Sequence, residues 1–256
     1  MSKPTRDSGA LGHFVGKWHQ REPEMALADP FCPPAQRPHF RAWGALLHEL
    51  REAAFELSDP SVTAGKCQWW AEALLALEAG EGRHPVTTAL VGAPGEWRGL
   101  AAALLAVAGE EPERPGDTAA ALAQLMPLAE ALAAAEAALF GADAAAPRAI
   151  AVHLLLQRLP EGLAAADQAR LPLHLLARHG LDAGSVAAGQ GEPLLRDWGR
   201  ELAAALPAPS PGLALFRRLR TGFDRVRLQR LGRGPRFDPP APLATVLRAW
   251  RLARAP

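Results

Sequence analysis

Apolar residues in this chain recur at helical spacing, and this periodicity limits the fold more than any other feature. No segment alternates apolar and polar residues over the length of a strand. Ala and Leu, which are strong helix formers, dominate the sequence, whereas β-branched residues that favour strands are scarce. The sequence therefore predicts an all-α fold. In Arg37–Leu57, for example, the apolar residues that share one face of the expected helix are Phe40, Trp43, Leu46, Leu47, Leu50, Ala54 and Leu57.

The 256 residues are enough to bury a large core in one domain, and no linker divides them. We expect residues 1–10 to form a disordered tail and residues 11–256 to form a single helical domain. Asp117 is placed to cap a long Ala/Leu helix, and Pro127 is expected to kink it. The expected helices are Leu11–Gln20, Arg37–Leu57, Thr63–Gly80, His84–Leu90, Glu96–Ala108, Thr118–Phe140, Ala145–Leu159, Leu171–His179, Pro193–Leu206, Leu213–Arg230 and Leu243–Ala255.

Charge is unevenly distributed, although the formal net charge is only +1. From Leu213 to the last residue there are 11 arginines against Asp224 and Asp238, a formal charge of +9, so the remainder carries −8. The overall balance gives no signal for a nucleic-acid partner. Two interpretations of the tail stay open. In one, Arg217, Arg218, Arg220, Arg225 and Arg227 form a surface patch that contacts anionic lipid headgroups of a membrane; in the other, the tail is a solvated face neutralised by the acidic remainder.

Two cysteines, Cys32 and Cys67, imply no disulfide framework and fit a reducing compartment. The first residues lack the apolar run of a signal peptide. No window offers the ~20 apolar residues of a membrane span, and the most apolar one contains Gln124, Glu130 and Glu136, as a core helix would. We expect a cytoplasmic protein that lies peripherally on the inner membrane if the tail binds lipid.

One segment, Lys66–Leu90, carries a specific pattern of residue types and spacings. It reads KCQWWAEALLALEAGEGRHPVTTAL. This resembles Leu-Gln-Trp-Trp-Arg-x-Ala-Leu followed by Ala-Gly-x-x-x-His-Pro-Val-x-x-Ala-Leu, a pattern of the squalene/phytoene synthase family of head-to-head prenyl transferases. Trp69 and Trp70 occupy adjacent helical positions, about 100° apart, so we expect only one of them to be buried in the core.

A second segment, Arg170–Gly180, reads RLPLHLLARHG and resembles the same family's Gly-Arg-x-Tyr-Leu-Pro and Asp-Leu-Ala-Arg-Phe-Gly. Weaker similarity extends over roughly Glu22 to Ala249, including the arginine-rich tail. The resemblance implies a single-domain isoprenoid synthase-like helical bundle around a central cavity.

The same resemblance indicates that the family's metal ligands are lost. Active members neutralise the departing diphosphate with Mg²⁺ held by two Asp-rich segments. The Asn and two Asp of the second segment correspond to Leu155, Leu159 and Leu163. Mg²⁺ requires oxygen ligands, and an unpaired charge in an apolar site is costly. We therefore expect neither metal nor cofactor at these degenerate positions.

The first Asp-rich segment corresponds to His48–Glu56, HELREAAFE, which contains no Asp. The preferred register places Arg51 and Phe55 at its two ligand positions. Glu52 and Glu56, together with Glu49, share one helix face. Two readings stay open for these acids: a remnant metal or polar site, and a solvated acidic stripe beside Arg51.

Arg158 matches a family arginine beside the diphosphate. It either binds an anionic headgroup or pairs with Glu161 at the helix end. Arg158, Arg51, Glu52 and Glu56 are thus the weak candidates for substrate binding, and no catalytic residue is expected.

Three functions follow from these expectations. The pattern resembles a degenerate branch that includes the mitochondrial complex I assembly factor of phytoene synthase type, which implies a non-catalytic isoprenoid- or lipid-related binding or assembly factor. The alternative is a divergent head-to-head prenyl transferase that acts on prenyl diphosphates with Mg²⁺. A third possibility is a structural partner of another protein, without a ligand, in which the cavity is filled. The sequence does not identify a protein partner.

Overall fold

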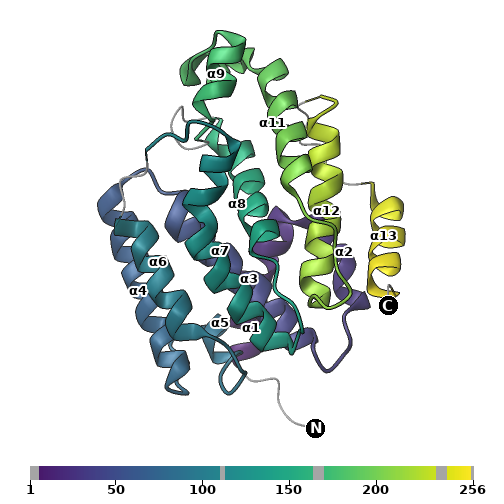
Figure 1. Ribbon diagram of the computed structural model, residues 1–256. Helices are drawn as coiled ribbons and strands as arrows, with labels where there is room; N and C mark the ends of the chain where they lie inside the picture. The colour runs from purple at the N-terminus through teal and green to yellow at the C-terminus, as the bar shows by residue number, and fades with distance from the viewer. Residues whose placement is uncertain (1–5, 110–112, 164–169, 235–240, 255–256) are drawn as a thin grey trace.

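The computed structural model describes residues 6–109, 113–163, 170–234 and 241–254 (Figure 1). Within these ranges the chain forms helices and connecting loops and no strand, so the all-α prediction is confirmed. The elements are α1 Arg6–Arg21, α2 Pro23–Ala28, η1 Asp29–Phe31, α3 Arg37–Phe55, α4 Pro60–Glu78, α5 Pro85–Thr88, α6 Trp97–Gly109, α7 Thr118–Phe140, α8 Pro147–Gly162, α9 Leu173–His179, α10 Ala183–Ser185, η2 Val186–Gln190, α11 Glu192–Ala205, α12 Leu215–Leu231 and α13 Pro242–Arg254.

The long helices lie close to their predicted positions. Helix α7 has the predicted bounds, and Asp117 caps it by accepting a 2.8 Å hydrogen bond from the backbone N–H of Ala120. The helix continues through Pro127. Helix α1 begins at Arg6, so residues 6–10, expected in a disordered tail, are helical, and residues 1–5 lie outside the described part. The short elements α2, η1, α10 and η2 were not predicted.

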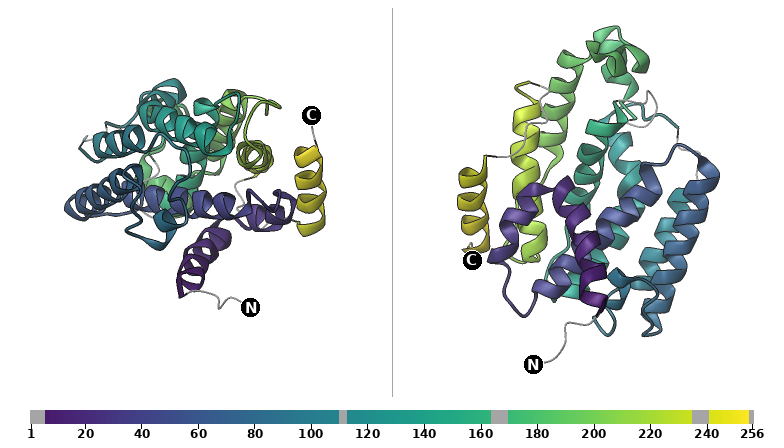
Figure 2. Two further views of the ribbon diagram at one scale, coloured as in Figure 1. Left: turned by 90° about the horizontal axis from the view of Figure 1, so that it is seen from below. Right: turned by 180° about the vertical axis from the view of Figure 1, so that it is seen from behind.

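The helices form a bundle whose two edges carry different elements (Figure 1). At one edge α4 packs on α6, and α6 packs on α7. In the middle α7 packs on α8, and α1 crosses α3 on the face seen in the right view of Figure 2. Towards the other edge α11 packs on α12, and α13 lies outermost against α2 and α12. Segments from both ends of the chain therefore meet around α12.

Helix α7 is long and apolar enough to cross a membrane, judged by length and composition alone. In this structure it packs between α6 and α8. Its Glu136 is buried and forms an ion pair inside the bundle. These contacts agree with the predicted core helix.

Aromatic side chains join α1, α3 and α12. Trp18 is fully buried, and its ring lies 6.0 Å from that of Phe40 and 5.9 Å from that of Phe216. Gly44 makes this approach possible, because a Cβ atom there would lie 2.4 Å from the Trp18 ring. Any larger residue at position 44 would separate α1 from α3.

The Trp-Trp and His-Pro-Val motifs have a structural role. Trp70 is 4% exposed and Trp69 is 45% exposed, which confirms that one of the pair is buried in the core. The His84 ring lies 4.9 Å from the Trp70 ring. Its Nδ1 accepts a hydrogen bond from the backbone N–H of Val86, which caps α5. These residues therefore connect α4 to the α5 loop.

The second resembling segment marks the ends of α9. Pro172 precedes the helix, and Gly180 ends it in the left-handed conformation at φ 62°. Arg114 donates a 3.2 Å hydrogen bond to the carbonyl oxygen of Leu171, and the Leu173 N–H donates one of 2.9 Å to Pro115. The motif therefore attaches α9 to the loop before α7.

We predict that Trp70→Ala lowers the free energy of unfolding by about 3–5 kcal/mol, because it leaves a cavity between α4 and the loop before α5. Trp69→Ala is the matched control and should change it by less than about 1 kcal/mol, since Trp69 is largely solvated. Urea denaturation followed by circular dichroism measures both. Similar losses in the two variants would contradict the assignment of Trp70 as the anchor.

Candidate functional site

Buried ion pairs between α12 and distant segments occupy the centre of the bundle. Arg217 donates from Nε and Nη2 to the two carboxylate oxygens of Glu136 on α7, both at 2.8 Å. Arg220 binds Glu22, between α1 and α2, at 3.0 and 2.6 Å. All four residues are at most 5% exposed. Such two-pronged contacts are among the strongest hydrogen bonds in proteins.

Two indole groups complete these pairs. The Nε1 of Trp43 donates to Glu136 at 2.8 Å, and that of Trp18 donates to Glu22 at 3.1 Å. Burial by itself raises the pKa of Glu22, but the positive charges of Arg220, Arg227 and Arg51 lower it to about 2. Glu22 is therefore ionised at neutral pH, although it is buried.

The tail arginines of α12 do not form the expected surface patch. Arg217 and Arg220 are buried, and Arg227 pairs with Glu24 of α2 at 2.7 and 2.5 Å. Arg225 donates to the backbone carbonyls of Leu206 and Pro207. The prediction that Arg217, Arg218, Arg220, Arg225 and Arg227 form a surface patch is therefore wrong. The acidic residues that neutralise three of these arginines, Glu136, Glu22 and Glu24, are buried inside the fold.

His153 of α8 adds an imidazole to the same centre. Its Nδ1 lies 2.9 and 3.0 Å from the two carboxylate oxygens of Asp224, and its Nε2 lies 3.9 Å from Glu22. Burial and the charge of Arg220 lower the pKa of His153 well below its ordinary value. Burial raises the pKa of Asp224 to about 6. At neutral pH the pair is thus a neutral imidazole that donates to a carboxylate.

The central cavity is present but small. It has a volume of about 20 Å³ and lies between α3, α7, α8 and α12. A cavity needs roughly 10–15 Å³ to hold one water, whereas ligand pockets measure about 300–1,000 Å³. The cavity therefore has room for one or two waters and is too small for a prenyl chain. Its polar lining consists of Glu22, His48, Arg51, His153, Arg217 and Arg220.

The three leucines that the sequence resemblance aligns with metal ligands lie on α8 and directly after it. Leu155 is 3% exposed and Leu159 is fully buried, while Leu163 is partly buried against the core. The whole stretch Val152–Arg158 is buried. Together with the arginines that line the cavity, these leucines do not fit a cluster of Mg²⁺ ions, which requires facing carboxylates.

The weak substrate-binding candidates are held by other protein groups. Arg51 is buried, with Nη2 3.0 Å from Glu56 and Nη1 3.3 Å from the side-chain oxygen of Gln157. Glu52 lies 3.2 Å from Lys66 of α4. Arg51 and Glu56 therefore form a structural ion pair at the end of α3, and Arg51 also links this end to Gln157 of α8.

Arg158 lies over the ring of Phe55 at 4.9 Å, and burial lowers its pKa to about 10. It is a buried cation that packs against α3. Glu161, the partner expected in the alternative reading, has a side chain outside the described part.

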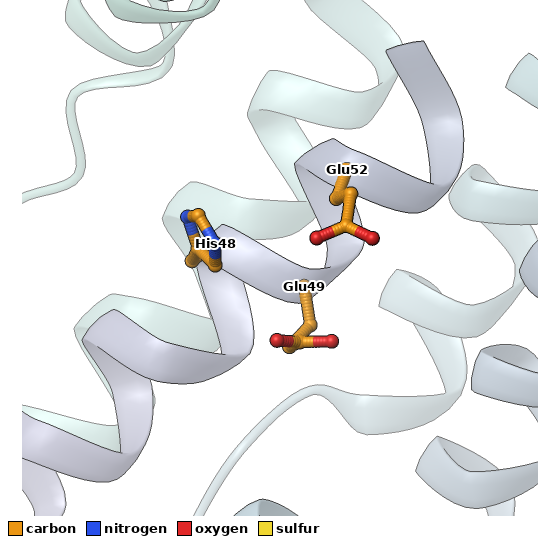
Figure 3. Close-up of side chains that lie close together, drawn as sticks. All are labelled: His48, Glu49 and Glu52. Carbon is orange, nitrogen blue, oxygen red and sulfur yellow. The ribbon is translucent and has the colours of Figure 1, made fainter. Parts of the chain in front are cut away.

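Three side chains of α3 could bind a single metal ion (Figure 3). Ligand atoms of His48, Glu49 and Glu52 all lie within 4.8 Å of one another. Burial and the charge of Arg51 lower the pKa of His48 to about 4, so its imidazole is neutral at pH 7. One imidazole and two carboxylates suit Zn²⁺ or Mn²⁺ better than Mg²⁺.

Cations already surround this cluster. Lys17 lies 3.9 Å from Glu49, and Lys66 is bonded to Glu52. Nη2 of Arg51 lies 3.4 Å from Nδ1 of His48. All three potential ligands come from one helix, and within the described part of the chain no second element adds a ligand.

The central residues Glu22, Glu136, His153 and Asp224 were not predicted as site residues. Glu136 and His153 each stand alone in an apolar helical run, which is a signal for a buried polar group. The charged residues of α12 offer a second signal, because positions 217, 220, 224 and 227 share one helix face. The pairing itself carries no sequence signal, because the partners of the three arginines are 81 to 203 residues away.

We predict that Glu22→Gln lowers the free energy of unfolding by about 3–5 kcal/mol at pH 7, because Arg220 is left buried without its counter-ion. A carboxyl whose pKa is lowered on folding stabilises the fold above its ordinary pKa, here 4.5, and this stability is lost as the pH falls through the folded value of about 2. The difference between wild type and variant should therefore narrow from pH 4.5 downwards.

Chemical denaturation across this pH range measures the effect. Glu192→Gln, which breaks an exposed pair with Arg196, is the matched control and should cost no more than about 1 kcal/mol. A difference between wild type and Glu22→Gln that stays constant with pH would contradict the ionised pair.

The fold resembles that of a solved structure, although comparison of the sequence alone finds no significant match. No protein-family model matches the chain, and no curated protein sequence is significantly similar to it. The crystal structure of squalene synthase HpnC from Alicyclobacillus acidocaldarius has a TM-score of 0.54 and 16% sequence identity to this chain, over 91% of this chain and 98% of that one. At this identity the likeness establishes the fold alone. The chain therefore has the all-α isoprenoid synthase fold of a squalene synthase.

Proposed function

We propose that this protein is a non-catalytic relative of the squalene/phytoene synthases that acts as an assembly or binding factor. The observation that carries the proposal is the character of α8, where Leu155 and Leu159 are buried at the positions that correspond to metal ligands. Stabilisation of the departing diphosphate is usually the largest contribution to such catalysis. Leucine side chains at these positions cannot stabilise the charge of a departing diphosphate.

The filled interior supports the same proposal. The Arg217–Glu136 and Arg220–Glu22 pairs occupy the centre of the bundle and leave a cavity of about 20 Å³. Binding a prenyl chain there would require the pairs to separate, which exposes charges to an apolar environment at a cost of several kcal/mol. Of the two non-catalytic roles, assembly needs no such opening. It also agrees with the resemblance to the complex I assembly factor of phytoene synthase type.

A pyrophosphate-release assay tests the absence of catalysis. Farnesyl and geranylgeranyl diphosphate are supplied with Mg²⁺ or Mn²⁺, with and without NADPH. We expect no release above the protein-free background, whereas squalene synthase HpnC, run in parallel, is the positive control. The proposal would be overturned if the wild-type protein released pyrophosphate and Glu52→Gln abolished this release. The control Glu72→Gln, at an exposed site on α4, should then leave the release intact.

A binding measurement separates the two non-catalytic roles. Equilibrium dialysis with labelled geranylgeranyl diphosphate is carried out on wild type and on Arg158→Gln. If the wild type binds geranylgeranyl diphosphate without turning it over, and Arg158→Gln weakens this binding, the isoprenoid-binding role is assigned. Absence of binding in both proteins assigns the assembly role.

A divergent prenyl transferase is the second candidate, and the cluster His48, Glu49 and Glu52 is the observation that favours it. Isothermal titration with Mn²⁺ tests it independently of substrate. The second candidate requires stoichiometric binding that Glu52→Gln removes and Glu72→Gln preserves. The first proposal predicts no such difference, because Lys17 and Lys66 already neutralise the two carboxylates.

A further inference from the structure

Helix α13 is an amphipathic helix at the outer edge of the molecule. It reads PLATVLRAWRLAR and contains three arginines and no acidic residue. Among the described residues it packs on one side, against α2, η1 and α12 (Figures 1 and 2). Its inner face carries Thr245 and Ala249, which are buried, and Leu252, which packs over Gly222 of α12.

The outer face of α13 is apolar although it meets solvent. Leu243 is 87% exposed, and Val246, Leu247 and Trp250 are 37–47% exposed. These positions, i, i+3, i+4 and i+7, form one continuous stripe. A buried helix face normally has this pattern, so a stripe of this kind turned outward indicates a contact surface.

Arginines border the stripe. Arg251 and Arg254 are exposed and Arg248 is half-buried. The Arg254 guanidinium lies 4.8 Å above the Trp250 ring. The surface thus combines large apolar side chains, an indole and positive charge.

We propose that α13 binds the surface of an anionic lipid bilayer through the stripe Leu243, Val246, Leu247 and Trp250. A helix with arginines beside such a stripe lies in the membrane interface with its apolar side among the acyl chains. Tryptophan prefers this interface, and each arginine near it adds attraction to anionic headgroups. The membrane contact expected from the tail is thereby assigned to α13 and not to α12, whose arginines are paired internally.

The charge of the helix argues against a second copy of the chain as the occupant. Two α13 helices that met through their stripes in parallel would repel each other through Arg251 and Arg254, and in an antiparallel pair neither helix would offer these arginines an acidic residue. A planar anionic surface avoids this repulsion and needs no groove, whereas a protein partner would need an acidic groove shaped for a convex helix. This inference is independent of the proposed function, because it uses no residue of the bundle interior.

Co-flotation of the full-length protein with vesicles tests the proposal. Vesicles of phosphatidylcholine alone are compared with vesicles that also contain phosphatidylglycerol. We expect binding to the anionic vesicles that weakens as salt rises. Arg251→Gln combined with Arg254→Gln should weaken it by roughly 25-fold, about fivefold for each charge. Leu243→Ser combined with Leu247→Ser should weaken it by roughly tenfold or more.

Matched controls come from the opposite edge of the molecule. Leu105→Ser and Arg98→Gln change exposed residues of α6 and should leave vesicle binding unchanged. All substituted residues of α13 are exposed, so every variant should unfold at the wild-type temperature, which a thermal scan verifies.

Three results would overturn the proposal. The first is equal flotation with neutral and anionic vesicles, or flotation with neither. The second is wild-type binding by both α13 double variants, or equal loss in the α6 controls. The third is a dimer in size-exclusion chromatography that the α13 variants dissociate, which would assign the stripe to a second copy of the chain.

Discussion

The burial of charge along α12 is the constraint on which the rest of this structure depends. A guanidinium can enter the interior only if a carboxylate meets it there, since the penalty for an unpaired charge is several kcal/mol. Arg217, Arg220 and Arg227 meet Glu136, Glu22 and Glu24 from segments 81, 198 and 203 residues away. Such pairs add little net stability over apolar packing, but each is costly to break. They therefore define how α7 and the segment from α1 to α2 lie against α12.

This arrangement also determines what the centre of the fold can do. The isoprenoid synthase fold is shared with a squalene synthase at 16% identity, but here the central space is about 20 Å³ and is lined by arginines, His153 and buried acids. Of the α3 cluster His48, Glu49 and Glu52, only His48 lines this space, and the two carboxylates lie beside Lys17 and Lys66. The shared fold thus encloses a small polar core in this protein.

Much of the architecture was predictable because local patterns encode it. The period of apolar residues located the long helices, Asp117 marked the start of α7, and adjacent positions required one of Trp69 and Trp70 to face outward. The resemblance to squalene and phytoene synthases identified Leu155 and Leu159 as buried hydrocarbon. The surface patch of tail arginines was wrong, because a count of charges does not reveal which residues face one another across the bundle. The central residues Glu22 and Asp224 were missed for the same reason.

The sequence by itself determined the long helices and the cap of α7 at Asp117, since each depends on residues within a few turns of one another. Only the tertiary structure decided that the α12 arginines lie inside, because their partners are up to 203 residues away. The tertiary structure likewise decided which side of α13 is covered. Its inner face could be distinguished from the stripe of Leu243, Leu247 and Trp250 only once α2 and α12 were in place, since both faces carry apolar residues and only contact with the bundle removes one of them from water.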